Sequence, residues 1–130
     1  MHKSASWVLR IGLSITFFWI GMMILQDPLG WFALVRPWAA ALVPGSPAAF
    51  MQETAMLDVA VAIMLLIPQL EWVGALVGTI HLLTVMLSVD VADFLVRDIG
   101  LLGAASALLI DSFPSSLLDR MKALLSRRSA

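Results

Sequence analysis

Apolar residues run along most of this chain in long stretches that polar residues interrupt at only a few places. Four stretches are long enough to form membrane helices, and they cover residues 7–25, 50–67, 72–89 and 94–110. A helix needs about 20 apolar residues to cross the hydrocarbon core of a bilayer. The pattern therefore predicts an all-α integral membrane protein, in which residues 1–130 form a single domain built as a four-helix bundle.

The longest connection, residues 26–54, is too apolar for a free loop. It holds four of the six prolines, which interrupt helices, yet it also carries Trp31 and Trp38 among other apolar residues. We expect a short helix or a re-entrant piece on the membrane interface, with both tryptophans at headgroup depth.

The C-terminal stretch, residues 115–127, has the pattern of an amphipathic helix. Its leucines and Met121 fall on one helical face, and the basic residues fall off that face. These basic residues are Arg120, Lys122 and Arg127. Each basic residue near anionic lipid contributes about 1 kcal/mol of attraction. We therefore expect a helix on the membrane surface, and a solvated charged tail is the alternative.

Composition agrees with a membrane protein and removes several chemistries. Hydrophobic residues make up 61% of the chain and charged residues 13%, whereas soluble domains have about 45–50% and about 25%. The net charge of −1 gives no basic surface for nucleic acid. Because the sequence has no cysteine, disulfides and thiolate metal sites cannot form within the chain. Nucleotide-binding and metalloprotease motifs are also missing from the sequence, and no metal ligand set is expected.

The distribution of basic residues predicts the orientation of the chain. Six of the eight Lys and Arg residues lie near the two ends, at positions 3, 10, 120, 122, 127 and 128. Basic residues favour the cytoplasmic side, and four spans place both termini on one side. Both termini are therefore predicted to be cytoplasmic. Arg10 lies about one turn inside the first span, and we expect its side chain to snorkel to the lipid headgroups.

Ionisable residues gather in the half of the predicted bundle that lies away from the termini. Asp58 lies in the second span, His81 near the middle of the third, and Arg97 and Asp98 at the head of the fourth. A charge in hydrocarbon costs about 3 kcal/mol on insertion scales, so such groups need partners. We expect these four residues to form one cluster. The cluster either binds a ligand or holds structural ion pairs, such as Arg97 with Asp58 or Asp98.

Small residues mark two expected helix-packing surfaces. Gly74 and Gly78 form a GxxxG pair in the third span, and Gly100, Gly103 and Ala104 form a stripe in the fourth. Small side chains allow the backbones of two membrane helices to approach closely.

Three passages resemble the DoxX-like superfamily of small four-helix bacterial membrane proteins, including its YkgB-like branch. They are residues 9–21, with Arg10, Gly12 and a Phe-Trp-Ile-Gly run; residues 42–47, which end in Ser-Pro; and residues 97–104, with a basic-Asp-x-x-x-Leu-Gly pattern. The family usually carries a glutamate near a glycine in its second helix, where this chain has Asp58. Members of this family are associated with thiosulfate:quinone oxidation, as a small membrane subunit, and with envelope complexes that manage oxidative or sulfur stress. The resemblance implies a redox-associated subunit of the bacterial inner membrane and establishes no reaction.

Two functions therefore stand as hypotheses. In the first, the chain is an accessory subunit of a quinone-linked redox complex, and its polar cluster binds a quinone head group or a small anion. It is not expected to be catalytic alone, and no catalytic residue is assigned. In the second, the chain is a structural subunit without a ligand, which packs in a larger respiratory, photosynthetic or transport complex. Both hypotheses expect other membrane subunits as partners.

Overall fold

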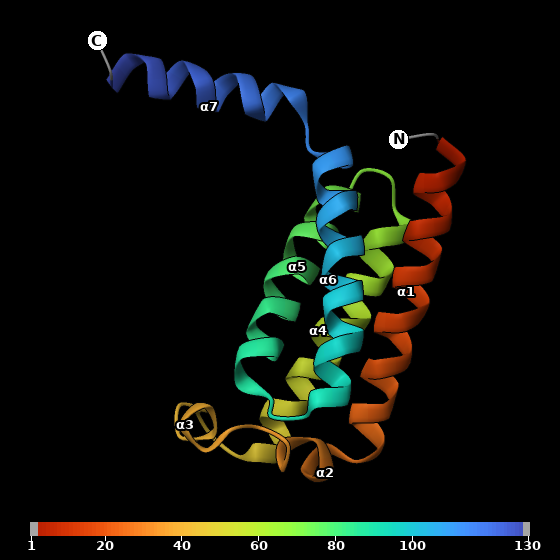
Figure 1. The fold of residues 1–130 in the computed structure, drawn as a ribbon, viewed down its shortest axis with the longest axis vertical. Coiled ribbons are helices and arrows are strands. Elements are labelled where there is room, and N and C mark those ends of the chain that lie inside the picture. Colours follow the sequence, from red (N-terminus) through yellow and green to blue (C-terminus); the bar gives the residue numbers. More distant parts are fainter. Residues whose placement is uncertain (1–2, 129–130) are drawn as a thin grey trace.

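A computed structural model describes residues 3–128, and the side chains of all of these except residues 92, 93, 127 and 128. The described residues are 84% helical and contain no strand. Four long helices lie side by side: α1 (Lys3–Gln26), α4 (Pro47–Leu66), α5 (Glu71–Ser88) and α6 (Ala92–Ser112) (Figure 1). The predicted all-α class is confirmed. Helices α1 and α6 extend beyond their predicted spans at both ends, α4 begins three residues earlier and ends one residue earlier than predicted, and α5 is shifted by one residue toward the N-terminus.

By length and composition, the helices long and apolar enough to cross a membrane are α1, α4 and α5. The fourth predicted span corresponds to α6, which does not join them. Every 18-residue window of α6 contains three charged residues, because Arg97 and Asp98 lie in all windows and either Asp93 or Asp111 lies in each. The charges at both ends of α6 therefore set it apart from the other three helices.

The proline-rich connection folds into two short helices, α2 (Pro28–Phe32) and α3 (Pro37–Ala40). Each begins at a proline, whose fixed backbone angle suits the first position of a helix. The backbone N–H of Arg36 donates to the carbonyl of Ser88 at 2.7 Å, which ties the connection to the end of α5. The expected short helix is therefore present as a pair. This end of the molecule, opposite the chain termini in Figure 1, is called the α2–α3 end below.

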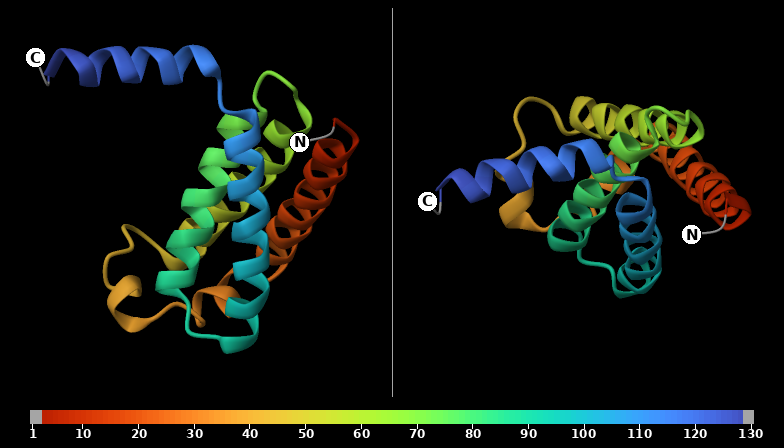
Figure 2. Two further views of the ribbon diagram at one scale, coloured as in Figure 1. Left: turned by 45° about the horizontal axis from the view of Figure 1, so that its top comes forward. Right: turned by 90° about the horizontal axis from the view of Figure 1, so that it is seen from above.

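The C-terminal helix α7 (Ser115–Arg128) projects away from the long helices (Figure 2). At its base, the ring of Phe113 packs edge-on against Trp72 with centroids 5.9 Å apart. Leu118, Leu124 and Leu125 are exposed on α7, as are Arg120 and Lys122, whereas the side chain of Arg127 lies outside the described residues. The predicted amphipathic helix is thus present, with its apolar leucines uncovered by the rest of the chain.

The main core is built from buried residues of all four long helices. Leu13 and Phe17 of α1 pack with Val61 and Leu65 of α4 in the main buried cluster. Glycine makes this approach close: a Cβ on Gly21 would lie 2.9 Å from the carbonyl oxygen of Ala55 in the α4 backbone. Backbone cannot yield as a side-chain tip can, so α1 and α4 fit together only with glycine at this position.

The two predicted small-residue surfaces differ in what lies beside them. A Cβ on Gly74 would lie 2.9 Å from the Cβ of Met64 in α4, and one on Gly78 would lie 3.2 Å from the Phe17 ring. Gly74 and Gly78 therefore lie against neighbouring helices. In contrast, a Cβ on Gly100 or Gly103 would meet no atom within 4 Å, so within this chain these two positions make no close helix contact.

Replacing Gly21 with alanine is expected to lower the free energy of unfolding by about 1–3 kcal/mol, the usual cost of overpacking. The matched control is Gly12→Ala in the same helix, where the new methyl group meets no atom within 4 Å. There, the better helix propensity of alanine should raise stability by up to about 1 kcal/mol. Thermal unfolding in detergent measures both changes. Equal shifts for the two variants would contradict the close α1–α4 contact at Gly21.

Candidate functional site

His81 and Asp58 are paired between α5 and α4. The imidazole Nε2 lies 3.1 Å from Oδ1 of Asp58, and the Asp58 residue is only 2% exposed. The bond fixes the ring, because the Nε2–H group donates to the carboxylate. In the neutral imidazole, Nδ1 then carries the free lone pair. Among the described residues Asp58 is the hydrogen-bonding partner of His81, so Nδ1 remains available to a ligand.

Arg97 and Asp98 form a second ion pair, within α6. Both Nε and Nη2 of Arg97 lie 3.1 Å from Oδ1 of Asp98. The guanidinium also lies 4.9 Å from the centre of the Phe94 ring, and that ring stacks on Trp31. Of the two partners expected for Arg97, which were Asp58 and Asp98, the structure shows Asp98. The long arginine stem folds back to the next residue and finds its counter-charge there.

One cavity brings the four predicted residues together. Asp58, His81, Arg97 and Asp98 all line a hollow of about 80 Å³ at the α2–α3 end, and its other walls are mostly apolar. The expected cluster is thus present as two ion pairs around one cavity. Because a water molecule occupies about 30 Å³ in the liquid, the cavity has room for very few small molecules.

The charges around this cavity do not balance when His81 is neutral. Asp58 and Asp98 contribute two negative charges and Arg97 contributes one positive charge, and protonation of the imidazole brings the sum to zero. A small anion would meet no excess of positive charge in either state. Among the described residues, no group of three or more His, Asp or Glu side chains lies close enough to hold a metal ion.

The hydroxyl groups around the cavity are bonded within their own helices. Thr16 donates to the carbonyl of Gly12 at 2.9 Å, and Thr54 donates to that of Phe50 at 3.0 Å. Such bonds to the preceding turn satisfy a hydroxyl in apolar surroundings without a partner from another element. Both hydroxyl protons are therefore already used in hydrogen bonds, and the side chains of the two charged pairs are the polar groups left for a ligand.

The two predicted interfacial tryptophans lie in different surroundings. Trp31 is half-buried, and its ring stacks on Phe94 with centroids 5.6 Å apart. It forms part of the cavity wall, which the sequence did not indicate. Trp38, by contrast, is 55% exposed on α3, as a side chain at the membrane interface would be.

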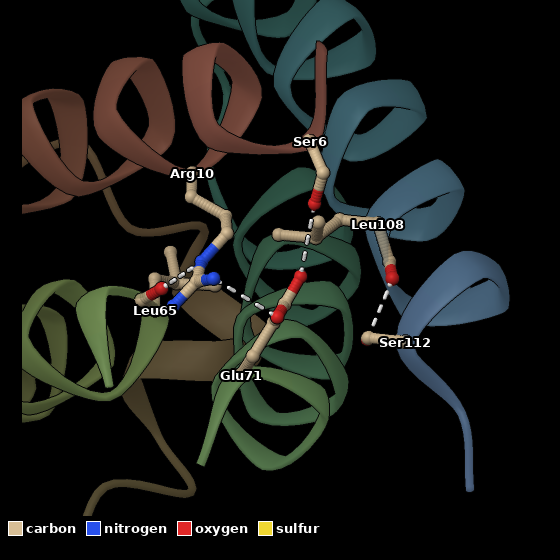
Figure 3. Close-up of polar contacts among 6 residues, drawn as sticks. All are labelled: Ser6, Arg10, Leu65, Glu71, Leu108 and Ser112. Atoms are coloured by element: carbon tan, nitrogen blue, oxygen red, sulfur yellow. Dashed lines mark hydrogen bonds and ion pairs between the residues drawn. The ribbon is translucent and has the colours of Figure 1, made fainter. Parts of the chain in front are cut away.

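A second polar cluster, which the sequence interpretation missed, lies at the other end of the long helices (Figure 3). Arg10 is only 4% exposed, so the expectation that it snorkels to the lipid headgroups is wrong. Its Nη1 lies 3.2 Å from Oε2 of Glu71, and its Nε donates to the carbonyl of Leu65 at 2.7 Å. Ser6 donates to the other oxygen of Glu71 at 3.3 Å.

Helix ends explain this cluster. Leu65 lies in the last turn of α4, where carbonyl groups lack partners within the helix. Glu71 is the first residue of α5, and the short α4–α5 turn brings it beside α1. The sequence signal that could have indicated this cluster is the pair of opposite charges at the borders of two predicted spans, Arg10 in the first and Glu71 just before the third. The Arg10 Nη2 atom is buried without a partner among the described residues, so the cluster is tightly closed around the guanidinium.

The Glu71→Gln variant is expected to lose about 3 kcal/mol of stability, because it leaves the buried Arg10 charge without its counter-charge. Adding Arg10→Met should recover most of that loss. The control is Asp90→Asn, which breaks the pair between Arg36 and Asp90 at 3.6 Å, where the aspartate side chain is 81% exposed. That change should cost less than about 1 kcal/mol. Thermal unfolding of all variants in one detergent tests this, and a Glu71→Gln effect as small as that of the control would contradict it.

Comparison with known proteins adds no assignment to this geometry. No family model, no curated protein and no solved structure matches the chain. The function is therefore inferred from the contacts and charges of the chain itself.

Proposed function

We propose that this chain is an integral protein of the bacterial inner membrane, with its four long helices as a bundle of spans and both termini cytoplasmic. Large apolar side chains on the outside of the helices support this, among them Trp19, Leu87 and Ile110. Serine and threonine side chains on these helices donate within the protein, either to their own helix, as Thr79 does to Ala75 at 2.7 Å, or to a neighbouring one, as Ser14 does to Ala62 at 2.7 Å. Exposed apolar side chains and hydroxyl groups that are bonded within the protein are both compatible with a lipid environment.

The charged helix α6 is the fourth span in this proposal. The free-energy cost of placing these charges in the membrane is reduced, because Arg97 is paired with Asp98 and Asp98 is buried inside the protein. Charged residues in membrane helices usually face the bundle interior and pair with one another. The exposed leucines and basic residues of α7 suit a cytoplasmic membrane surface in the same arrangement.

Within this arrangement, the chain acts as an accessory subunit of a quinone-linked redox complex. The observation that carries this proposal is the buried pair of His81 and Asp58 on the wall of a cavity between helices. Quinone reduction consumes protons at the ring oxygens, and a histidine held by a carboxylate can bind such an oxygen and exchange a proton with it. The electrons would come from other subunits. The resemblance to DoxX-like proteins points in the same direction.

A structural subunit without a ligand is the second candidate, and an open groove between α1 and α6 favours it. Ala5, Val8 and Gly12 of α1 face Leu101 and Ala104 of α6 across a hollow of about 610 Å³. Small and apolar residues on both sides allow a helix of another subunit to approach closely. The long helices pack less closely here than on the α4 side, so a partner helix could complete the bundle.

The orientation can be tested with single cysteines, because the chain has none of its own. In intact cells, Ala41→Cys in the proline-rich connection should react with a membrane-impermeant maleimide. Ser4→Cys and Ser126→Cys should react only after the cells are opened. Labelling of Ser4→Cys in intact cells would place the N-terminus outside and overturn the orientation.

Quinone binding can be tested with the double variant Asp58→Asn, His81→Gln, which preserves the hydrogen bond in shape but removes its charge and exchangeable proton. We expect the affinity for decylubiquinone in nanodiscs to fall about tenfold to a hundredfold, the usual effect of losing a hydrogen bond to a charged group. Arg36→Gln is the control, since Arg36 lines neither the cavity nor the groove. Quenching of tryptophan fluorescence reports binding.

Native mass spectrometry of the extracted protein separates the two candidates. A form that retains quinone supports the quinone-linked role. Recovery only within a larger assembly, together with no saturable binding of decylubiquinone by the wild-type chain, would support the structural role instead.

A further inference from the structure

His81 lies between two hollows of different size. It lines the smaller, more enclosed cavity of about 80 Å³, and it also lines a more open groove of about 440 Å³ between α3, α4 and α5. Asp58, which lies 3.1 Å from Nε2 of the imidazole, lines the cavity and not the groove. Nδ1 is the ring nitrogen that Asp58 leaves free for a ligand.

Size assigns a ring-shaped ligand to the groove. An apolar cavity of about 150 Å³ in another protein holds one benzene molecule, which is roughly twice the volume of the smaller cavity here. A substituted ring therefore does not fit the cavity in this structure. The groove, by comparison, falls within the range of about 300–1,000 Å³ that is typical of small-molecule sites.

The chemistry of the groove walls indicates an amphiphile. The walls are mostly apolar, with Trp38, Leu42, Phe50 and Leu57 among them. The hydroxyl of Thr84 on the same wall donates to its own helix, to the carbonyl of Ile80 at 2.9 Å. The hydroxyl of Ser88 likewise donates to the carbonyl of Thr84. The imidazole is therefore the group on this wall with a free polar edge, and it lies at the boundary with the cavity.

Charge excludes an anionic head in favour of a neutral one. Asp58 stands directly behind the imidazole, so the pair as a whole carries no net positive charge even when the ring is protonated. A neutral oxygen can accept a hydrogen bond from the protonated ring, and a hydroxyl can donate to the neutral ring. An anion would gain little from either state.

We propose that the ligand is a neutral ring compound with a long apolar tail, which lies in the groove between α3, α4 and α5 with its head oxygen on Nδ1 of His81. The small cavity behind the imidazole then holds water rather than the ring. This inference rests on the proposed function, because it takes an isoprenoid quinone as the compound of this class. It replaces the small anion as ligand, and it assigns α3 the role of covering the tail.

The test places a bulky side chain in the groove. Thr84→Phe fills the groove from its exposed wall and leaves the cavity unchanged, and Leu83→Phe is the matched control on the same helix, at an exposed position that lines neither hollow. The probe is decylubiquinone, titrated into nanodiscs that contain the purified chain. We expect Thr84→Phe to bind at least about tenfold more weakly than the wild type, which corresponds to about 1.4 kcal/mol. Leu83→Phe should bind as the wild type does.

The outcomes separate this inference from the function on which it rests. If the wild type shows no saturable binding, the proposed function fails and the inference fails with it. If the wild type binds and Thr84→Phe binds equally well, quinone binding stands but the groove is not its site. The comparison requires that Thr84→Phe is folded, which is shown by thermal unfolding at the same temperature as the wild type. If Thr84→Phe does not fold, Thr84→Trp provides a second bulky variant.

Discussion

Charge pairing between helices that are otherwise apolar is the constraint on which this structure depends. Two buried pairs join different helices: His81 with Asp58 links α5 to α4, and Arg10 with Glu71 links α1 to α5. Removing charge from water is costly, so each pair must form for the helices to pack. Helix α5 takes part in both pairs, near its middle and at its start, and this fixes its register against two neighbours.

The two pairs have different surroundings, and this difference separates a structural role from a binding role. Arg10 is enclosed by the Leu65 carbonyl, the Glu71 carboxylate and the Trp7 ring, whose centre lies 4.1 Å from the guanidinium. That cluster lines none of the hollows described above. His81 instead has a cavity on one side and a groove on the other. The Arg10–Glu71 pair is therefore enclosed and joins two helices, whereas the His81–Asp58 pair joins two helices and also borders two hollows.

The packing of the helices is uneven in the same way. Gly21 and Gly78 allow α1 to lie directly against α4 and α5, whereas open space surrounds Gly12, Gly100 and Gly103. The chain is consequently closed on its α4 side and open between α1 and α6. Among the described residues, the groove beside His81 and the groove between α1 and α6 have no lining residue in common, so the proposed binding site and the proposed docking face are compatible.

The sequence by itself determined the helices and the polar residues that matter. Apolar runs of about 20 residues have few alternatives to a helix, and prolines at positions 28, 37 and 47 mark where helices begin. Depth along the predicted spans was enough to gather Asp58, His81, Arg97 and Asp98 at one end. These features are local, or depend only on distance along a helix.

Only the tertiary structure decided which charges pair and which surfaces remain open. Whether Arg97 reaches another helix or folds back to Asp98 depends on rotation of α6 and on the arginine rotamer, which no spacing in the sequence fixes. The burial of Arg10 required the α4–α5 turn to deliver Glu71 to α1. The groove beside His81 is lined by residues of α3, α4 and α5, and α5 is distant in the sequence from the other two. Pairing, burial and hollow space are properties of several helices together, so a pattern within one helix cannot specify them.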